Sequence, residues 1–228
     1  MGLILNLETA TTNCSVSLAK NGETLAIKEH NSANYSHAEQ LHLFIQDCFK
    51  ETDFELSDLN AIAVSKGPGS YTGLRIGVSA AKGLCYALEV PLISVPTLKS
   101  MAAQVQDVAT DLILPVLDAR RMEVYSAIYD TSLNEVRETR AEVINESSFS
   151  EYYTDKNVLV VGSGAEKIQS VIKHQNLSFD IAVIPSAVNM GTLSHFKFLK
   201  KDFEDVAYFE PYYLKDFILQ KPKKQNSQ

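Results

Sequence analysis

The chain has 228 residues, of which 28 are acidic and 21 basic, giving a formal net charge of −7. Hydrophobic residues make up 45% and charged residues 21% of the chain, which is typical of a globular protein and excludes a disordered or fibrous one. The acidic balance argues against a general nucleic-acid binder, which needs clustered Lys and Arg. No apolar run approaches the ~20 residues that span a bilayer, and the start lacks a secretion signal. We therefore expect a cytoplasmic protein without membrane association.

The first half of the chain predicts a run of strands interrupted by two helices. Asn21–Gly22 is a residue pair that accepts positive φ, so it predicts a hairpin between two of the strands. Ser36 and Glu39 are spaced as a capping box at the start of a helix with a buried face through residue 49. A Gly-Pro-Gly-Ser break at residues 67–70 precedes a long helix at 71–88. The predicted strands are 3–7, 15–19, 24–29, 60–65 and 91–95.

From residue 112 the same order of elements starts again. Strands are predicted at 112–117, 123–129, 135–143 and 158–161, with a weak helix near 147–153 and another beginning near 164. Two tandem βββαβα-type units, the second reduced, predict an α/β protein with two lobes facing a cleft, the architecture of actin, Hsp70 and the sugar kinases (the ASKHA ATPase fold). We predict lobes at 1–108 and 109–220, followed by a frayed polar tail at 221–228.

The segment from Lys66 to Gly77 is the most distinctive stretch of the chain. A glycine-rich turn that opens a helix offers backbone N–H groups to an anion, but this one lacks the lysine and hydroxyl residue of a Walker loop. Gly73, Gly77, Ala81 and Cys85 recur every four residues and form a smooth stripe along the helix. Such a stripe permits close helix packing, and we favour packing over anion binding.

Two segments closely resemble the TsaB family, also called YeaZ. They are Gly67–Gly77 and Asp118–Ala119–Arg120–Arg121–Met122–Glu123–Val124–Tyr125, and the resemblance returns at residues 211–215. It implies a subunit of the bacterial machinery that makes threonylcarbamoyladenosine in tRNA. Its implied partners are the catalytic paralogue TsaD, as a heterodimer, and the ATPase TsaE. The chain would contact tRNA only through this complex.

The resemblance also implies that the chemistry has been lost from this chain. The metal-binding histidine pair of the catalytic paralogue matches Thr97 and Met101, neither of which replaces imidazole as a ligand. Its acidic pair matches Thr12 and Asn13, and its glycine-rich second phosphate loop matches residues 118–121. We expect no catalytic, cofactor-binding or metal-binding residue in the isolated subunit; whether ATP or ADP lodges at the boundary with TsaD and TsaE is left open.

The remaining histidines and cysteines favour structural roles. His37 and His42 are five residues apart, about 140° around a helix, so they do not form a chelating pair. Cys14, Cys48 and Cys85 are odd in number and far apart, which favours buried reduced thiols.

Two groups of residues are predicted to contact a partner. The first is a two-helix surface, expected to form a homodimer when the protein is alone and a heterodimer with TsaD through an overlapping surface; bulky residues at Gly73 or Gly77 should then abolish pairing and leave the fold intact. Its residues are Leu41, Phe44, Ile45, Phe49, Gly73, Arg75, Gly77 and Ala81. The second is Asp118 with Arg120 and Arg121, which would contact an anion or a partner's acidic residue, or pair with Glu123.

An alternative function is a free-standing ATP-dependent transferase or kinase that uses the cleft between the lobes. It requires phosphate loops and an acidic group for magnesium. The sequence offers only Glu8, Asp118 and the turn Gly162–Ser163–Gly164, which we interpret as structural because it lacks a third glycine.

Overall fold

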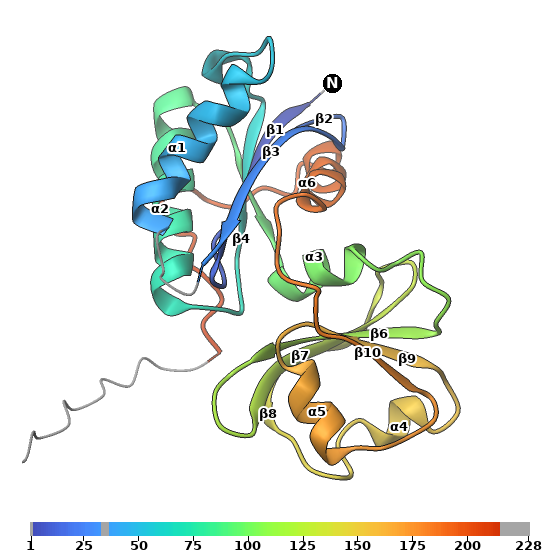
Figure 1. Ribbon diagram of the computed structural model, residues 1–228. Coiled ribbons are helices and arrows are strands. Elements are labelled where there is room, and N and C mark those ends of the chain that lie inside the picture. Colours follow the sequence, from blue (N-terminus) through green and yellow to red (C-terminus); the bar gives the residue numbers. More distant parts are fainter. Residues whose placement is uncertain (1, 33–36, 215–228) are drawn as a thin grey trace, which may run out of the picture.

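The computed structural model describes residues 2–32 and 37–214. Ser36 of the predicted capping box and the predicted tail at 221–228 lie outside the described residues. Two α/β lobes are stacked with their sheets crossing, and helices lie between and outside them (Figure 1). In the described part of the chain, no helix has the length and apolar character needed to cross a membrane.

The first lobe is built on a five-stranded mixed sheet with the order β3-β2-β1-β4-β5. Its strands are β1 (Leu3–Glu8), β2 (Asn13–Lys20), β3 (Glu23–Asn31), β4 (Ala61–Ser65) and β5 (Leu92–Val95). β1 pairs antiparallel with β2 and parallel with β4. The predicted hairpin between β2 and β3 is confirmed, because Asn21 and Gly22 turn the chain with φ of 55° and 92°.

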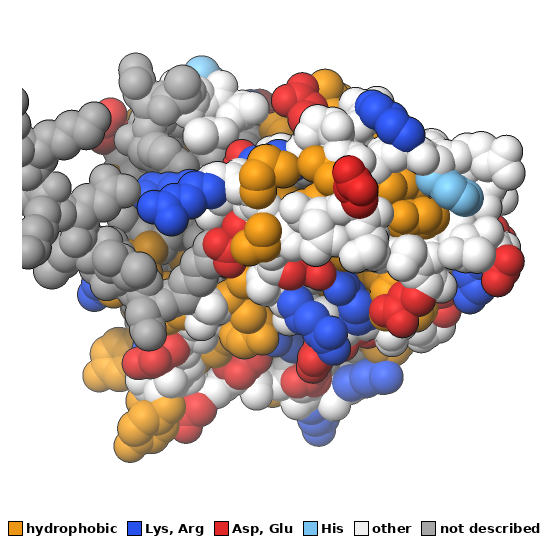
Figure 2. Space-filling model, turned by 90° about the horizontal axis from the view of Figure 1, so that it is seen from below, with side chains coloured by type: hydrophobic (Ala, Val, Ile, Leu, Met, Phe, Trp, Pro, Cys, Tyr) orange, Lys and Arg blue, Asp and Glu red, His pale blue; other side chains and the backbone are white. Residues whose placement is uncertain are grey.

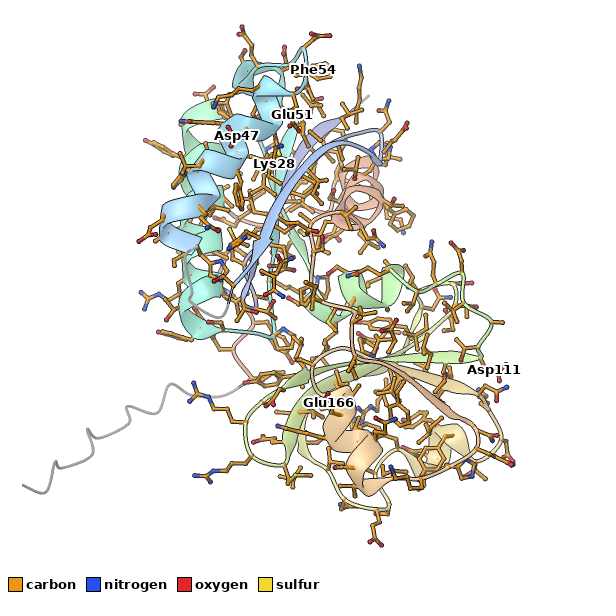
Figure 3. The ribbon with its side chains drawn as sticks, viewed as in Figure 1. Lys28, Asp47, Glu51, Phe54, Asp111 and Glu166 are labelled. Carbon is orange, nitrogen blue, oxygen red and sulfur yellow. The ribbon has the colours of Figure 1, made fainter. Side chains whose placement is uncertain are left out.

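Two long helices cover one face of this sheet: α1 (His37–Lys50) and α2 (Tyr71–Leu88), which lie side by side in Figure 1. Alternate residues of the strands point to this face, so Leu5 of β1 joins Leu41 of α1 and Ala81 of α2 in one core cluster. A short 3-10 helix, η1 (Leu56–Asp58), follows α1. Figure 3 shows Lys28 of β3 beside Glu51, just past the end of α1, and the two form an ion pair that ties strand to helix.

The second lobe repeats the topology of the first. Its sheet has the order β10-β9-β6-β7-β8. Read from the other end, this is the order of the first sheet with each strand replaced by its counterpart, so the predicted tandem duplication is confirmed. The second lobe is also reduced, as predicted: α4 (Ser150–Tyr153) and α5 (Ala165–Val171) replace the longer α1 and α2. Its strands are β6 (Leu112–Asp118), β7 (Glu123–Asp130), β8 (Glu135–Val143), β9 (Val158–Val161) and β10 (Leu177–Asp180).

The last helix of each repeat packs on the sheet of the other lobe. α3 (Thr97–Ala103) follows β5, yet Leu98 and Met101 are buried against the second sheet. α6 (Met190–Leu199) follows the second repeat, yet Met190 is buried against the first sheet, beside Ile4 and Ile93. The predicted boundary at 108/109 is therefore wrong for both helices, because strand and helix periodicity does not reveal which sheet a helix covers.

The segment that returns from the second lobe to α6 is held by side chains of β2. Asn13 Nδ2 donates to the Pro185 carbonyl (3.0 Å), and Ser17 Oγ donates to the Ala187 carbonyl (2.7 Å). Ser15 Oγ accepts from the Ala187 N–H (2.9 Å). These buried bonds fix the position of one lobe against the other, because breaking any of them would leave an unpaired polar group in the interior.

Candidate functional site

The glycine-rich turn before α2 is packed tightly against the end of β1. The Gly67–Pro68 peptide bond is cis, and the Ser70 N–H donates to the Ala10 carbonyl (2.6 Å). Ser70 caps α2, its hydroxyl accepting from the Gly73 N–H (3.3 Å). A Cβ on Gly69 would lie 2.4 Å from the Ala10 carbonyl oxygen, so this glycine is required by the close approach of two backbones.

Gly73, Gly77 and Ala81 face the interior of their own lobe. All three are buried, and the Thr9 hydroxyl donates to the Gly73 carbonyl (2.8 Å). A Cβ on Gly73 would lie 2.1 Å from the Thr9 carbonyl oxygen, and one on Gly77 would lie 2.3 Å from the Thr9 hydroxyl oxygen. The prediction that this stripe meets a partner helix is therefore wrong: the small residues bring α2 close to β1.

The same correction applies to part of the predicted surface on α1. Leu41 and Ile45 are buried in the core of the first lobe, so they are not available to a partner. Phe44 and Phe49 are half-buried against that core, and Arg75 of α2 is exposed. Of the predicted two-helix surface, only the residues that point outward are therefore available to a partner.

An outward-facing groove of about 720 Å³ lies between α1 and α2, which we call the outer groove. Its residues are Ala38, His42, Tyr71, Thr72, Arg75, Ile76, Ser79, Ala80, Gly83 and Leu84. Gly83 is exposed, and a Cβ built on it meets no atom within 4 Å. A mid-helix glycine costs up to about 1 kcal/mol relative to alanine. The sequence already indicated a second small-residue position on this helix. Gly83 lies six residues after Gly77, roughly 240° around the helix, and therefore on a different face.

A second and larger cavity, the inter-lobe cleft, has a volume of about 910 Å³. It is lined by the turns that follow β1, β4, β6 and β9 and by the segment at 212–214. Tyr71 and Thr72, at the start of α2, line both the cleft and the outer groove. The two cavities are therefore neighbours that meet at one helix terminus.

Glu8 at the end of β1 is a fully buried carboxyl group behind the cleft. Its Oε1 accepts from the Ser65 hydroxyl (2.7 Å) and the Ala10 N–H (2.6 Å), whereas Oε2 has no partner among the described residues. Desolvation raises the pKa of Glu8 to about 7, although the hydrogen bonds from Ser65 and the backbone oppose the shift. Glu8 does not line the cleft, so it is not placed to hold a metal ion there.

The loop after β6 carries the predicted Asp118, Arg120 and Arg121 at the rim of the cleft. The Asp118 carboxylate accepts from Lys167 Nζ and from the Arg120 N–H, both at 2.6 Å, so its charge is already balanced. Arg120 and Arg121 are exposed and have positive φ of 70° and 51°. The alternative of an ion pair with Glu123 is not seen: among the described residues neither guanidinium pairs with a carboxylate.

Thr97, Met101 and Asn13, which the family resemblance singles out, make packing or structural contacts. Thr97 and Met101 are buried in α3, and a Cβ on Gly162 would lie 2.3 Å from the Met101 Cε and 2.5 Å from the Val116 carbonyl oxygen. The glycine turn at Gly162 therefore serves close packing. Asn13 is used in the bond to Pro185 described above.

The histidines and cysteines do not assemble a metal site in the described part of the chain, where no three His, Cys, Asp or Glu side chains gather. His37 Nε2 lies 2.7 Å from the Thr11 carbonyl oxygen, and burial lowers its pKa. Cys14, Cys48 and Cys85 are buried free thiols, as predicted, and burial raises the pKa of Cys14 and Cys48 to about 11.

The duplicated lobes and the cleft between them define a two-lobed α/β protein of the predicted actin-like fold class. A family model described as TsaD, tRNA N6-adenosine threonylcarbamoyltransferase, matches residues 31–216. The chain is also 32% identical over 226 residues to the Escherichia coli tRNA threonylcarbamoyladenosine biosynthesis protein TsaB, covering 94% of this chain and 95% of the relative. The chain belongs to the TsaB family, a branch of the group that this model describes.

Other relatives and structures agree with this placement. The Bacillus subtilis TsaB protein is 36% identical over 131 residues, covering 55% of this chain and 54% of its own. The structure titled YeaZ from Pseudomonas aeruginosa is 25% identical and superposes with a TM-score of 0.79, covering 94% of this chain and 100% of that one. A Pseudomonas aeruginosa structure described as similar to the peptidase YEAZ has a TM-score of 0.85 at 24% identity, with the same coverage, and supports the fold.

Proposed function

We propose that this chain acts in the biosynthesis of threonylcarbamoyladenosine in tRNA, as a subunit without catalysis of its own that pairs with TsaD. The names of the relatives support the pathway, and the match to the TsaD model supports a paralogous partner of similar fold. One observation carries the proposal. Thr97 and Met101 are buried and Asp118 is salt-bridged to Lys167, while the outer groove between α1 and α2 stays open.

The outer groove is the surface that we assign to pairing. Its floor has the apolar Ile76 and the small residues Ala80 and Gly83, so a helix of a partner can approach closely. Arg75 at its edge is exposed and supplies a polar rim. TsaD would occupy this groove in the complex, and a second copy of the chain would occupy it when TsaD is absent.

Replacing Gly83 by arginine should abolish both pairings, because a long charged side chain would fill the floor of the groove. The fold should persist, since a side chain at Gly83 meets open space. Analytical ultracentrifugation should then show a monomer, and co-purification with TsaD should be lost. Glu39→Arg, at an exposed position of α1 that does not line the groove, is the matched control and should pair normally. Pairing of the Gly83 variant at wild-type affinity would assign the interface elsewhere.

We also propose where nucleotide binds, where in the cell the complex acts and how TsaE takes part. The isolated subunit would hold no cofactor, and ATP or ADP would bind where this chain, TsaD and TsaE meet, near the shared start of α2. The complex would act in the cytoplasm and contact tRNA through its assembled surface. The alternative of a free-standing kinase or transferase is disfavoured because Asp118 is bound by Lys167 and Glu8 lies outside the cleft lining.

Reconstitution tests the function directly. Threonylcarbamoyladenosine formation by TsaD and TsaE should depend on this chain and fall to background when it is omitted, with modified nucleoside measured by mass spectrometry. Calorimetry of the chain alone with ATP and magnesium should give no heat of binding. Full activity without the chain would refute the proposed function, and tight ATP binding with turnover by the chain alone would instead support the kinase or transferase.

A further inference from the structure

The rim of the inter-lobe cleft carries two arginines that form no ion pair with any carboxylate among the residues that the structure describes. Arg120 and Arg121 are exposed, and Asp118, the carboxylate of their own loop, is engaged by Lys167 at 2.6 Å. Both arginines adopt the left-handed backbone region, which residues with a Cβ rarely occupy. The loop therefore presents two adjacent positive charges toward solvent at the mouth of the cleft.

Two tyrosines line the same cleft on the side of the first lobe. Tyr212 and Tyr213 are 44% and 38% exposed, so part of each ring is accessible. The Tyr212 N–H donates to the Lys66 carbonyl (2.7 Å), and the Tyr213 ring lies 4.9 Å from that of Tyr71. These contacts hold the backbone of Tyr212 and the ring of Tyr213 on the start of α2 and the turn before it, and both residues line the cleft.

We propose that this rim binds a short single-stranded segment of RNA, with phosphates on Arg120 and Arg121 and a base stacked on Tyr212 or Tyr213. A guanidinium fork matches phosphate oxygens in a bidentate geometry. Exposed aromatic rings stack on bases, and the two features together are how proteins hold single strands. The identity of the RNA rests on the proposed function, which makes the substrate tRNA the molecule within reach.

The surrounding charge limits the size of this contact. The chain has a net charge of −7, and Figure 2 shows acidic and basic side chains interspersed over the face seen from below. The described residues seen in Figure 2 form no broad basic surface, so the two arginines are a local contact that adds to RNA binding by the assembled complex. The site differs from a Mg-nucleotide site, since Asp118 and Glu8 are both engaged within the protein.

The test measures binding of unmodified tRNA to the complex of this chain with TsaD by fluorescence anisotropy at several salt concentrations. Arg120→Asn/Arg121→Asn removes both charges and keeps a residue that tolerates the left-handed region. It should weaken binding about 10-fold at low salt and reduce the slope of log affinity against log salt by about 1.4, the contribution of two single-strand phosphate contacts. Arg120→Lys/Arg121→Lys should keep most of the slope. Arg140→Asn, an exposed arginine of β8 outside the cleft, is the control and should change neither.

A second pair of variants tests the aromatic half of the site. Tyr212→Ala/Tyr213→Ala should weaken binding of the same tRNA about 10-fold without changing the salt slope, whereas Tyr212→Phe/Tyr213→Phe should bind normally, because stacking needs the ring and not the hydroxyl. Unchanged affinity and slope in the arginine double variant would overturn the proposal. The proposal would also be overturned if the arginine double variant lost pairing with TsaD while each remaining complex bound tRNA with unaltered affinity. The two arginines would then contact an acidic segment of a partner protein. Neither outcome affects the dependence of the modification reaction on this chain, which tests the proposed function separately.

Discussion

Replacing Gly73 by alanine is expected to destabilise the first lobe by about 3 kcal/mol or more, a large effect for adding one methyl group. The new Cβ would lie 2.1 Å from the Thr9 carbonyl oxygen, which belongs to the backbone at the end of β1. The backbone cannot move aside without disturbing the Thr9–Gly73 hydrogen bond and the Ala10–Ser70 contact beside it. Thermal unfolding followed by circular dichroism should show a melting temperature lower by roughly 10 °C.

The control for this variant is Gly83→Ala in the same helix. A Cβ at Gly83 meets nothing within 4 Å, so alanine should stabilise the helix by up to about 1 kcal/mol through its higher helix propensity. The two substitutions are chemically identical and differ only in the face of α2 that they occupy. Equal melting temperatures for the two variants would contradict the observed orientation of α2.

Replacing Glu8 by glutamine should remove a pH dependence from the stability of the protein. The folded-state pKa of about 7 lies above the ordinary carboxyl value of 4.5, so the folded state binds the proton more tightly than the unfolded chain. Glu8 therefore contributes stability that is fully present below pH 4.5 and is lost as the pH rises through 7. A shift of this size corresponds to about 3 kcal/mol across that window.

Chemical denaturation of the wild type and Glu8→Gln at several pH values between 4.5 and 8 measures this contribution. The difference in unfolding free energy between the two proteins should change in favour of the variant as the pH rises, by about 3 kcal/mol over the range. Other titrating groups cancel in the difference. Ser65→Ala, which removes a hydrogen bond that lowers the pKa of Glu8, should move the transition to higher pH. A difference independent of pH would show that Glu8 is ionised throughout.

The order of strands and long helices could be predicted from the sequence because its signals are local. Asn21–Gly22 marks a hairpin, Ser70 caps α2, and the period of the apolar residues separates strands from helices. Both halves of the chain show the same predicted order of strands and helices, and this order predicts the duplicated lobes although the halves share no evident sequence repeat. α3, β10 and α6 were not predicted, because they are short or lack a strong period.

The orientation of α2 could not be predicted, since its small residues fall on two faces. Periodicity groups Gly73, Gly77 and Ala81 together but does not say whether the group meets a strand of its own lobe or another molecule. The exposed face at Ser79, Ala80 and Gly83 holds equally small residues. Only the tertiary contact with Thr9 distinguishes them.

The candidate site was predicted in part. Residue types predict that Thr97 and Met101 bind no metal ion, because neither side chain replaces imidazole as a ligand, and this stays a prediction. The pairing of Asp118 with Lys167 joins residues 49 apart in sequence, and the hydrogen bond from Ser65 to Glu8 joins residues 57 apart. Such long-range contacts leave no local pattern, so only the structure shows that Arg120 and Arg121 form no ion pair within the described part of the chain.

The placement of α3 and α6 on each other's sheets means that neither lobe is an independent folding unit. A fragment ending near residue 108 would lack Ala187 and Met190, which cover one side of β1 and β4, and would expose the apolar side of α3. Both halves should consequently melt in a single calorimetric transition, and a partner that stabilises α2 should slow amide exchange in the distant lobe as well.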